Sequence, residues 1–507
     1  MLGKVYSASI LGIEAKTVKV ETDVRDSNLP GWSMVGLPET AVKEARERVA
    51  SAIRNSGYRL LNRRITTNLS PADLKKVGAH FDLPIAISLL AASKICPIKS
   101  VENILFAGEL SLSGKLLPIK GALVLALTAL NHGLKAIVIP HGNFKEASFV
   151  KGIEIIGVAN LVEAVHFLTE GTIPLQNTID ENFQTDQAAP DFSEVRGQLI
   201  AKRALEIASS GGHNVLMVGP PGTGKTMLAE RLPSILSPLS ESEAIEVMKI
   251  KSCHGVLLNR EFIPTIRPFR APHHSASAVG LSGGGNNNTS HIGEISLAHN
   301  GVLFLDELPE FRRDVLEVLR QPIERGIVHI VRAGLSISYP AKFMLVAAMN
   351  PCPCGYYGHP AKPCICSVSQ IIHYNKKISG PLIDRIDLHI TLQPPSHYEL
   401  MNAGSAEVSS AIRGRVLATR EIQQRRYKGK IDCNAELKAK DLEEVCALTP
   451  NDKQFLISAS ERMNISARSL HRILKISRTI ADMSGEENIN TSHISEAMQY
   501  RPSEERI

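Results

Sequence analysis

The sequence predicts an α/β protein in which two α/β domains are followed by a set of helices. At 507 residues the chain has room for roughly three domains. Apolar β-rich runs alternate with amphipathic helical patterns over 1–170 and again over 191–398, and helical patterns dominate 399–507. The segment 171–190 is polar and follows neither period, so we interpret it as a linker.

The composition is that of a globular chain. A formal net charge of +6 permits contact with nucleic acid but does not demonstrate it. No apolar run approaches the ~18 to 20 residues that a membrane span needs. Glu14 and Lys16 interrupt the first apolar stretch, which argues against a secretory signal. We therefore expect a cytoplasmic protein with no membrane partner.

The first domain is predicted from its own strands and helices. Strand-like runs occupy Thr17 to Thr22 and Ala136 to Ile139, and an amphipathic helix is expected from Ala41 to Asn55. These elements are enough for an independent α/β domain.

A glycine-rich turn follows the apolar run Asn214 to Val218 and precedes a helix. Its spacing fits G-x-x-x-x-G-K-[ST], in which backbone N–H groups surround phosphates, the lysine reaches the β and γ phosphates, and the threonine binds Mg²⁺. The predicted nucleotide-binding residues are Gly219, Pro220, Pro221, Gly222, Thr223, Gly224, Lys225 and Thr226.

A second nucleotide element ends the apolar strand Gly301 to Leu305. The two carboxylates that follow it, Asp306 and Glu307, suit a Mg²⁺ anchor and a group that polarises the attacking water. Together with Lys225 they predict an ATPase that uses ATP and Mg²⁺, with Lys225 and Glu307 in catalytic roles.

The segment between these two motifs contains the adjacent pair His273 and His274. Adjacent side chains diverge and no glutamate stands at H-E-x-x-H spacing, so we favour hydrogen-bonding histidines over a metal site. The run of glycine and asparagine over 283–288 predicts a flexible loop.

Downstream of Glu307, a helix is expected from Arg312 to Arg325, ending near Gly326. The stretch 327–339 then alternates in polarity around a turn at 333–334, which is the pattern of a β-hairpin. The next strand, 343–349, ends at Asn350.

Four cysteines fall within the loop 352–366. Four thiolates can close a tetrahedral Zn²⁺ site, and His359 could replace one of them; the alternative is four free thiols. The irregular Pro, Gly and Tyr composition of the loop favours structural zinc bound by Cys352, Cys354, Cys364 and Cys366.

The stretch Gly108 to Ile119, with the helix and strand after it, resembles the proteolytic domain of Lon-type proteases, whose fold is ribosomal S5 domain 2-like. The resemblance places the serine and lysine of the catalytic dyad near His80 and Leu123, which cannot perform that chemistry. We therefore expect no protease activity, and a role in assembly or DNA contact. A shifted alignment leaves three other candidates for a dyad: Ser70, Ser88 and Lys120.

The ATPase segment is similar to the magnesium-chelatase branch of AAA+ ATPases, and the whole chain is similar to the ComM/YifB competence family. The resemblance implies that the stretch Val195 to Gln198 packs on the adenine, with an ordinary helix entry as the alternative, and that Asn350 is the sensor-1 residue. It makes the 283–288 region a helix-2 insert and 327–339 the pre-sensor-1 hairpin. The residues expected to contact DNA are Ser277, Asn286 and Arg332.

Two further arginines acquire roles from the same resemblance. Arg385, between Asp384 and Asp387, is either a local ion pair or an arginine finger that reaches a neighbouring subunit's γ-phosphate. The finger implies a ring, most simply a hexamer. Arg468 follows an N-cap at Ser466 and matches the sensor-2 position, with Arg472 as the competing candidate.

The family implies a ring-forming ATP-driven DNA motor, a helicase or branch-migration factor of homologous recombination. It would act on single-stranded or branched DNA, as in integration of transforming DNA during natural competence. Two alternatives remain open, a magnesium-chelatase-type motor subunit and an ATP-dependent protein remodeller.

Overall fold

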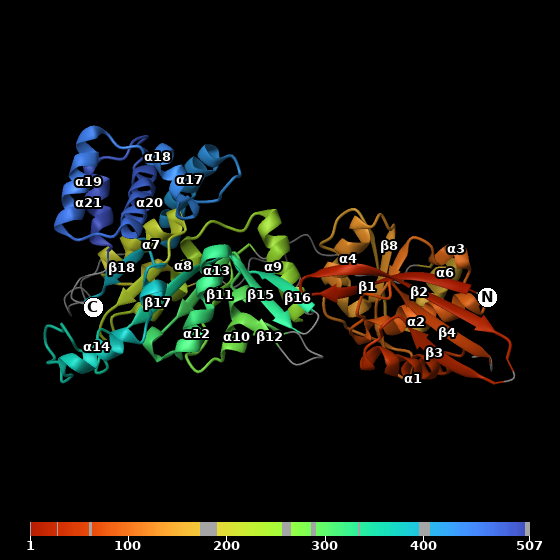
Figure 1. Ribbon diagram of the computed structural model, residues 1–507. Coiled ribbons are helices and arrows are strands. Elements are labelled where there is room, and N and C mark those ends of the chain that lie inside the picture. Colours follow the sequence, from red (N-terminus) through yellow and green to blue (C-terminus); the bar gives the residue numbers. More distant parts are fainter. Residues whose placement is uncertain are drawn as a thin grey trace.

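The computed structural model describes residues 2–27, 29–59, 63–172, 190–255, 265–284, 291–332, 335–394 and 406–501. Two α/β parts lie side by side along the chain, the first coloured red to orange and the second yellow to cyan (Figure 1). A blue group of C-terminal helices lies beside the second part. No helix in these described ranges is long and apolar enough to cross a membrane.

The first part is built on a seven-stranded mixed sheet of order β3-β4-β2-β1-β5-β8-β9. β1, β2 and β4 pair antiparallel, whereas the remaining neighbours run parallel. The strands are β1 (Leu2–Leu11), β2 (Glu14–Arg25), β3 (Gly31–Val35), β4 (Arg64–Ser70), β5 (Ile104–Phe106), β8 (Ala136–Pro140) and β9 (Glu154–Val158), with a small separate ribbon of β6 (Glu109–Leu110) and β7 (Leu116–Leu117).

Helices complete this first part. The expected helix from residue 41 is α1 (Thr40–Asn55), which starts one residue earlier and buries one side in the core. Helix α2 (Asp82–Ala92) is buried along its whole length, as its almost uniformly apolar sequence dictates. The other helices are α3 (Ile98–Val101), α4 (Ala122–Asn131), α5 (Phe144–Ala147) and α6 (Leu161–Glu170).

The second part contains a five-stranded sheet of order β11-β14-β17-β10-β18, and every pairing in it is parallel. Its three central strands read as continuous apolar runs because both faces of such a sheet are covered. The parallel-sheet core expected from the sequence is therefore confirmed. The strands are β10 (Val215–Val218), β11 (Phe269–Arg270), β14 (Gly301–Leu305), β17 (Phe343–Met349) and β18 (Leu388–Thr391).

The predicted hairpin is present as β15 (Ile327–Arg332) and β16 (Leu335–Pro340), paired antiparallel. The prediction of a single helix before the hairpin is wrong. The structure has two helices, α12 (Arg313–Val318) and α13 (Arg320–Arg325), with a break at Leu319. Pro322 explains the break, since it has no N–H for the carbonyl of Val318 and its ring crowds that group. The second helix does end at Gly326, whose φ is +65°.

The remaining elements of the second part surround the sheet. They are α7 (Leu199–Gly211), α8 (Lys225–Ile235), α9 (Glu241–His254), α10 (Ala278–Ser282), β12 (Gly283–Gly284), β13 (His291–Ile292), α11 (Glu294–Leu297), α14 (Val368–Lys376) and α15 (Gly380–Ile383).

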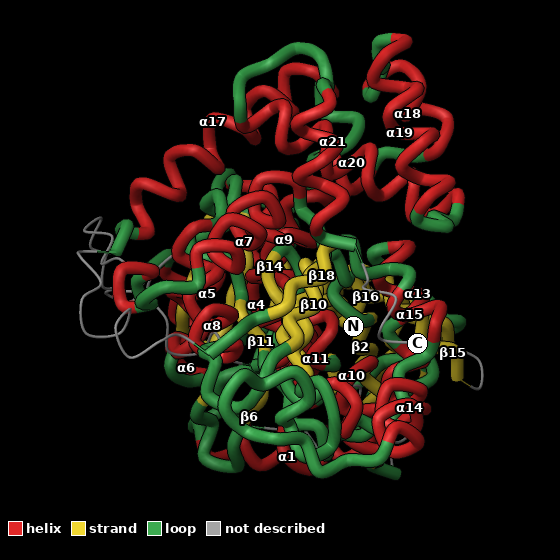
Figure 2. Tube along the Cα trace, turned by 90° about the vertical axis from the view of Figure 1, so that its left-hand side faces the viewer, coloured by secondary structure: helices red, strands yellow, loops and turns green. Residues whose placement is uncertain are grey.

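The C-terminal helices lie at the top of both views, over α7 (Figures 1 and 2). Residues of α7 share one hydrophobic core with those of the long helices, so the C-terminal group is anchored on the sheet part. These helices are α17 (Ser409–Tyr427), α18 (Ala439–Val445), α19 (Pro450–Arg462), α20 (Ala467–Met483) and α21 (Thr491–Gln499).

Helix α9 joins the two α/β parts, because it packs against α4 of the first (Figure 1). Met248 is buried in the core of the first part. Ser252 donates its hydroxyl to the carboxyl group of Glu146, and its carbonyl accepts the N–H of Gly121 at 3.0 Å. Ile337, in the middle of β16, contacts the β1–β2 turn through a second, smaller apolar cluster that also contains Tyr339 and Ile13.

Candidate functional site

The phosphate-binding loop connects the end of β10 to the start of α8. Gly219 donates its N–H to the carbonyl of Met349 at 3.2 Å, so the start of the loop is hydrogen-bonded to the end of the neighbouring strand β17. Gly222 and Gly224 have φ values of +80° and +86° with open space where a Cβ would lie, so glycine is needed there for backbone conformation. Lys225 is the first residue of α8, as predicted.

The ammonium group of Lys225 lies inside this loop. It donates to the carbonyls of Gly219 at 2.7 Å and Pro220 at 2.9 Å, and to Oδ1 of Asn350 at 3.2 Å. Burial lowers the pKa of Lys225, and the carboxylates of Asp306 and Glu307 oppose that shift. The predicted phosphate-binding cation and the predicted sensor residue are therefore in direct contact.

The predicted Mg²⁺ ligands also meet. The hydroxyl of Thr226 donates to Oδ2 of Asp306 at 2.7 Å, although the residues are 80 positions apart. Strands β14, β17 and β10 are neighbours and parallel, so their carboxyl ends bring Asp306, Asn350 and the loop to one edge of the sheet. Hydroxyl and carboxylate oxygens are the ligands that Mg²⁺ prefers.

Glu307 stands at the end of the same strand with a left-handed backbone, φ +51°. Its N–H is fixed by Oδ1 of Asp306 at 2.8 Å, and its side chain is half-exposed. Nδ1 of His274 lies 3.4 Å from its carboxylate. The position of His274 beside Glu307 was not predicted, because nothing in the local pattern links residues in different loops.

The other histidine of the pair supports this arrangement. The rings of His273 and His274 lie 4.0 Å apart, and His273 shares a hydrogen bond of 2.8 Å with the hydroxyl of Ser275. His273 is hydrogen-bonded as predicted, and both rings make aromatic contacts.

Val195 and Gln198, the two ends of the stretch predicted to pack on the adenine, lie in different surroundings. The side chain of Val195 is 3% exposed and belongs to the protein core. Gln198 reaches the nucleotide loop, since its Nε2 donates to the carbonyls of Thr223 at 3.1 Å and Gln393 at 2.8 Å. Gln198 thereby connects the loop to the chain beyond β18.

Arg385 and Arg468 meet at a single carboxylate, that of Glu324 on α13. Arg385 pairs with Glu324 and donates to the carbonyl of Pro381, whereas Nη2 of Arg468 lies 3.4 Å from the same Glu324 oxygen. The described contacts of both arginines are with residues around Glu324, and none of them is with the P-loop. The competing candidate is structural: Arg472 is buried and donates to the carbonyl of Ile386 at 2.7 Å.

The four cysteines of the 352–366 loop form a compact cluster. Their sulfur atoms all lie within 4.8 Å of one another. The distances from Cys352 to Cys354 and Cys364 are 3.3 and 3.7 Å, and Cys354 lies 3.6 Å from Cys364. Four sulfurs at about 2.3 Å from one ion lie roughly 3.8 Å apart in a tetrahedron, so the cluster fits Zn²⁺.

The thiols of the cluster differ in acidity. The N–H groups of Tyr356 and Ile365 lower the pKa of Cys354 to about 6, which favours the thiolate. At Cys364 and Cys366, backbone N–H groups lower the pKa less than burial and the neighbouring cysteines raise it. His359 accepts N–H groups from Ala361 and Lys362 at 3.0 Å through Nδ1. Its Nδ1 is thereby committed to the loop, so four cysteines are a better ligand set than three cysteines and a histidine.

The expected DNA contacts are only partly described. Ser277 is the N-cap of α10, and its Oγ accepts the N–H of Gly280 at 3.0 Å. Arg332 is the last residue of β15 and pairs with Leu335 at the turn end of the hairpin. Asn286 lies outside the described residues.

The positions that correspond to a protease dyad in the first part are occupied by buried groups. His80 shares a hydrogen bond of 2.9 Å with the carbonyl of Ala8, and burial lowers its pKa to about 4. Leu123 is 2% exposed. The Ser88 hydroxyl lies 2.6 Å from the Thr22 hydroxyl, and Lys120 packs beside Gly255. The described contacts therefore assemble no serine–lysine dyad.

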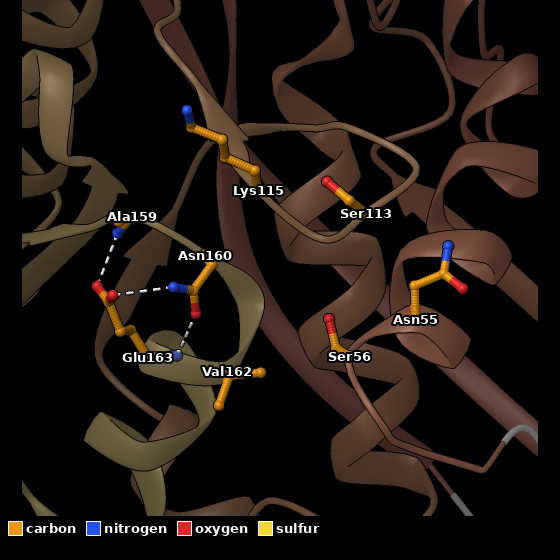
Figure 3. A pocket seen from close by; sticks show the side chains of 8 residues that line it. All are labelled: Asn55, Ser56, Ser113, Lys115, Ala159, Asn160, Val162 and Glu163. Atoms are coloured by element: carbon orange, nitrogen blue, oxygen red, sulfur yellow. Dashed lines mark hydrogen bonds between the residues drawn. The ribbon is translucent and has the colours of Figure 1, made fainter.

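A cavity of about 520 Å³ lies between the end of α1 and the start of α6 (Figure 3). Glu163 accepts the N–H of Ala159 at 2.8 Å and the side-chain amide of Asn160 at 2.9 Å. Asn160 in turn caps α6 through the N–H of Glu163 at 2.9 Å. These polar groups serve helix capping, so this cavity does not compete with the P-loop as the functional site.

Comparison with known proteins places the chain in a family. Models of the magnesium chelatase subunit ChlI match residues 20–143 and 191–400, and a model of its C-terminal part matches 406–501. Competence protein ComM of Haemophilus influenzae is 44% identical over 506 residues, covering 99% of this chain and 97% of its own length. The chain belongs to the ComM/YifB family.

Other ComM/YifB proteins match equally completely. YifB of Salmonella typhimurium is 42% identical over 505 residues, again 99% of this chain and 97% of its own length. YifB of Escherichia coli shows the same 42% identity and the same coverage. For this ComM/YifB chain, the magnesium-chelatase-like AAA+ motor implies ATPase activity with ATP and Mg²⁺, and the residues converging at the sheet edge are those such chemistry needs.

Proposed function

We propose that this ComM/YifB protein is a ring-forming ATPase that moves DNA during homologous recombination, and that it acts in the integration of transforming DNA. The observation that carries the proposal is the separation of its charged groups. Lys225, Thr226 and Asp306 converge at one edge of the sheet, whereas Arg385 and Arg468 gather elsewhere on Glu324. A site completed by a neighbouring subunit accounts for both clusters.

In the proposed mechanism each chain residue has one task. Lys225 binds the β and γ phosphates from within the loop, and Thr226 with Asp306 holds Mg²⁺, which neutralises phosphate charge. Glu307 orients the attacking water from its half-exposed position, and His274 steadies that carboxylate. Asn350 positions the same water beside Lys225, while Arg385 of an adjacent subunit supplies positive charge.

The DNA-directed part of the proposal rests on the relative and on one element. The 44% identical Haemophilus influenzae protein is named for competence. The β15–β16 hairpin forms a separate two-stranded ribbon, and Arg332 directly precedes its turn. We assign this hairpin to the ring's central channel, where one arginine per subunit would contact phosphates.

The remaining parts receive supporting roles. The Lon-like fold of 1–170 is proposed to serve assembly, consistent with the α4–α9 contact that ties it to the motor. The helices of 399–507 are proposed as the lid that carries Arg468. The four-cysteine loop is proposed to bind one structural Zn²⁺.

The ChlI models also support a second candidate, a motor subunit that drives metal insertion. ATP hydrolysis measured with and without single-stranded and branched DNA separates the two functions. The DNA motor predicts stimulation by DNA that disappears at high salt, and the Glu307→Gln protein must show no turnover under either condition. If the rate of ATP hydrolysis by the parent protein does not change with any of the DNAs added, the DNA-motor proposal is contradicted but the ATPase activity is not.

A further inference from the structure

The cysteine loop and the P-loop are in contact, although about 130 residues separate them in sequence. Gly355, which follows Cys354, has φ +84° and lies against Pro221 of the P-loop. A Cβ built on Gly355 would be 2.7 Å from Cδ of Pro221, 2.9 Å from its Cγ, and 3.9 Å from Cγ of Asn350. A side chain at position 355 would therefore clash with the nucleotide loop and come into van der Waals contact with the residue bound to Lys225.

This contact extends a chain of bonds that leads to Lys225. The end of β17 accepts the N–H of Gly219 at 3.2 Å, and Asn350, the next residue, accepts the ammonium of Lys225 at 3.2 Å. Cys352 follows after one proline, is completely buried, and its carbonyl accepts the N–H of Gly355 at 3.0 Å. The turn that carries Gly355 is thus anchored on the backbone of the most buried cysteine of the cluster.

A P-loop needs such support because three of its eight residues are glycines, which lose the most conformational freedom on ordering. A metal ion bonded to Cys352 and Cys354 would hold their turn rigid from one side. Since Gly355 directly follows the second of these ligands, rigidity of the turn is transmitted to Pro221. Pre-ordering a binding loop reduces the entropy cost of ligand binding.

We infer that the metal-bound cysteine loop is a wall of the nucleotide site, in which Gly355 is a positioning residue for Pro221, so that metal loading sets affinity for nucleoside triphosphate. The inference rests on the proposed ATPase function and on Zn²⁺ as the metal. It goes further by coupling the two sites, which a purely structural zinc loop would not do.

Two glycines in the same loop provide a matched pair of variants. Gly358 also has positive φ, +74°, but nothing lies within 4 Å of the Cβ that alanine would add. Gly355→Ala and Gly358→Ala therefore impose similar backbone strain, and only Gly355→Ala pushes on Pro221. A third variant, Pro221→Ala, removes the ring that Gly355 contacts and creates no clash.

The measurements are the dissociation constant of a fluorescent ATP analogue, by titration, and zinc content, by elemental analysis, on the full-length protein. We expect about one zinc per subunit in all three variants, near-parent affinity for Gly358→Ala, and affinity roughly tenfold weaker for Gly355→Ala. Pro221→Ala should also bind more weakly. Parent affinity in both Gly355→Ala and Pro221→Ala would overturn the inference.

Metal removal tests the coupling from the other end. Parent protein stripped with a chelator should bind the analogue several-fold more weakly and regain its affinity when Zn²⁺ is added back. Unchanged affinity after complete stripping would overturn the inference, and so would parent protein purified without zinc. Lys225→Ala distinguishes failure of the inference from failure of the proposed function. If this variant binds ATP as the parent does, the proposed ATPase site is wrong, independently of the results for Gly355→Ala.

Discussion

Lys225 and Glu307 belong to one site but stand in different surroundings. The ammonium of Lys225 is buried among loop carbonyls, whereas the carboxylate of Glu307 is half-exposed beside His274. The surroundings of Lys225 suit binding of a phosphate group, and those of Glu307 suit contact with a water molecule. Substitutions at the two positions should therefore affect different steps.

Lys225→Ala should weaken ATP binding at least tenfold, because it removes the positive charge inside the loop. Glu307→Gln should bind ATP like the parent but lose about 100-fold or more in turnover, because the amide cannot accept the proton of the water. Equilibrium binding and steady-state hydrolysis, measured on both variants, check this difference. Equal loss of binding in the two would contradict the assigned roles.

His80 makes the stability of the first part depend on pH. Its folded-state pKa of about 4 lies below the unfolded value near 6.5, so the stabilisation is complete above pH 6.5 and is lost as pH falls from 6.5 towards 4. Between pH 7 and pH 5 the parent should lose about 2 kcal/mol more unfolding free energy than His80→Gln, since one unit corresponds to 1.36 kcal/mol.

The chain's single tryptophan makes this measurable. Trp32 lies in β3, where its indole N–H donates to Thr67 at 3.0 Å, so its fluorescence reports urea unfolding of the first sheet. Asp82, whose pKa burial raises to about 6 against the opposing effect of Arg48, acts in the opposite direction, but it is present in both proteins. Parallel pH profiles for parent and variant would show that His80 does not titrate as described.

Among the elements, the β15–β16 hairpin is the one that we propose to contact DNA. Arg332→Ala should leave nucleotide binding and ring assembly intact but lower DNA affinity, and reduce the slope of log affinity against log salt by about one. Arg425→Ala, which removes an exposed arginine from α17, is the charge-matched control and should change neither. Titrations at several salt concentrations decide, and identical curves for Arg332→Ala and the parent would remove the hairpin from the DNA site.

The cysteine loop is the second element with a distinct test. Cys354→Ser should lose zinc, because three sulfurs no longer close the tetrahedral site, whereas Cys253→Ala, outside the cluster, should keep about one zinc per subunit. Elemental analysis and thermal unfolding give the answer. Parent protein without zinc, and of unchanged stability after chelation, would return these cysteines to free thiols.

At the scale of the whole molecule, the arginine pair on Glu324 is the feature on which the proposed ring rests. Either arginine must exchange its contact with Glu324 before it can reach a phosphate. In a ring this exchange would accompany assembly or ATP binding, because phosphate carries more negative charge than one half-exposed carboxylate.

Arg385→Ala should still bind ATP but lose hydrolysis by about 10³-fold, since no finger reaches the neighbouring site. Mixing it with Glu307→Gln should restore part of the activity, because some interfaces then combine an intact Glu307 with an intact Arg385. ATPase assays across mixing ratios, with co-assembly verified by mass measurement, test this. Co-assembled but inactive rings would contradict the finger.

The sequence by itself determined the features that depend on near neighbours along the chain. The P-loop, the carboxylates after β14, the β15–β16 hairpin and the four-cysteine loop were all predicted, since turns, strand alternation and ligand spacing are local properties. Local pattern also had a limit: Pro322 splits the helix expected over 312–325. The prediction followed the apolar periodicity of this stretch, but in the fold the missing N–H and the ring of Pro322 interrupt the helix.

Only the tertiary structure decided which of these local features meet. The order β14-β17-β10 brings Asp306 and Asn350 to the P-loop. The tertiary structure also determined that Arg468 contacts Glu324, 144 positions away, where Arg385 binds as well. It placed Gly355 beside Pro221. Such contacts arise from strand order and packing between distant segments, for which the spacing of residues in one stretch carries no signal.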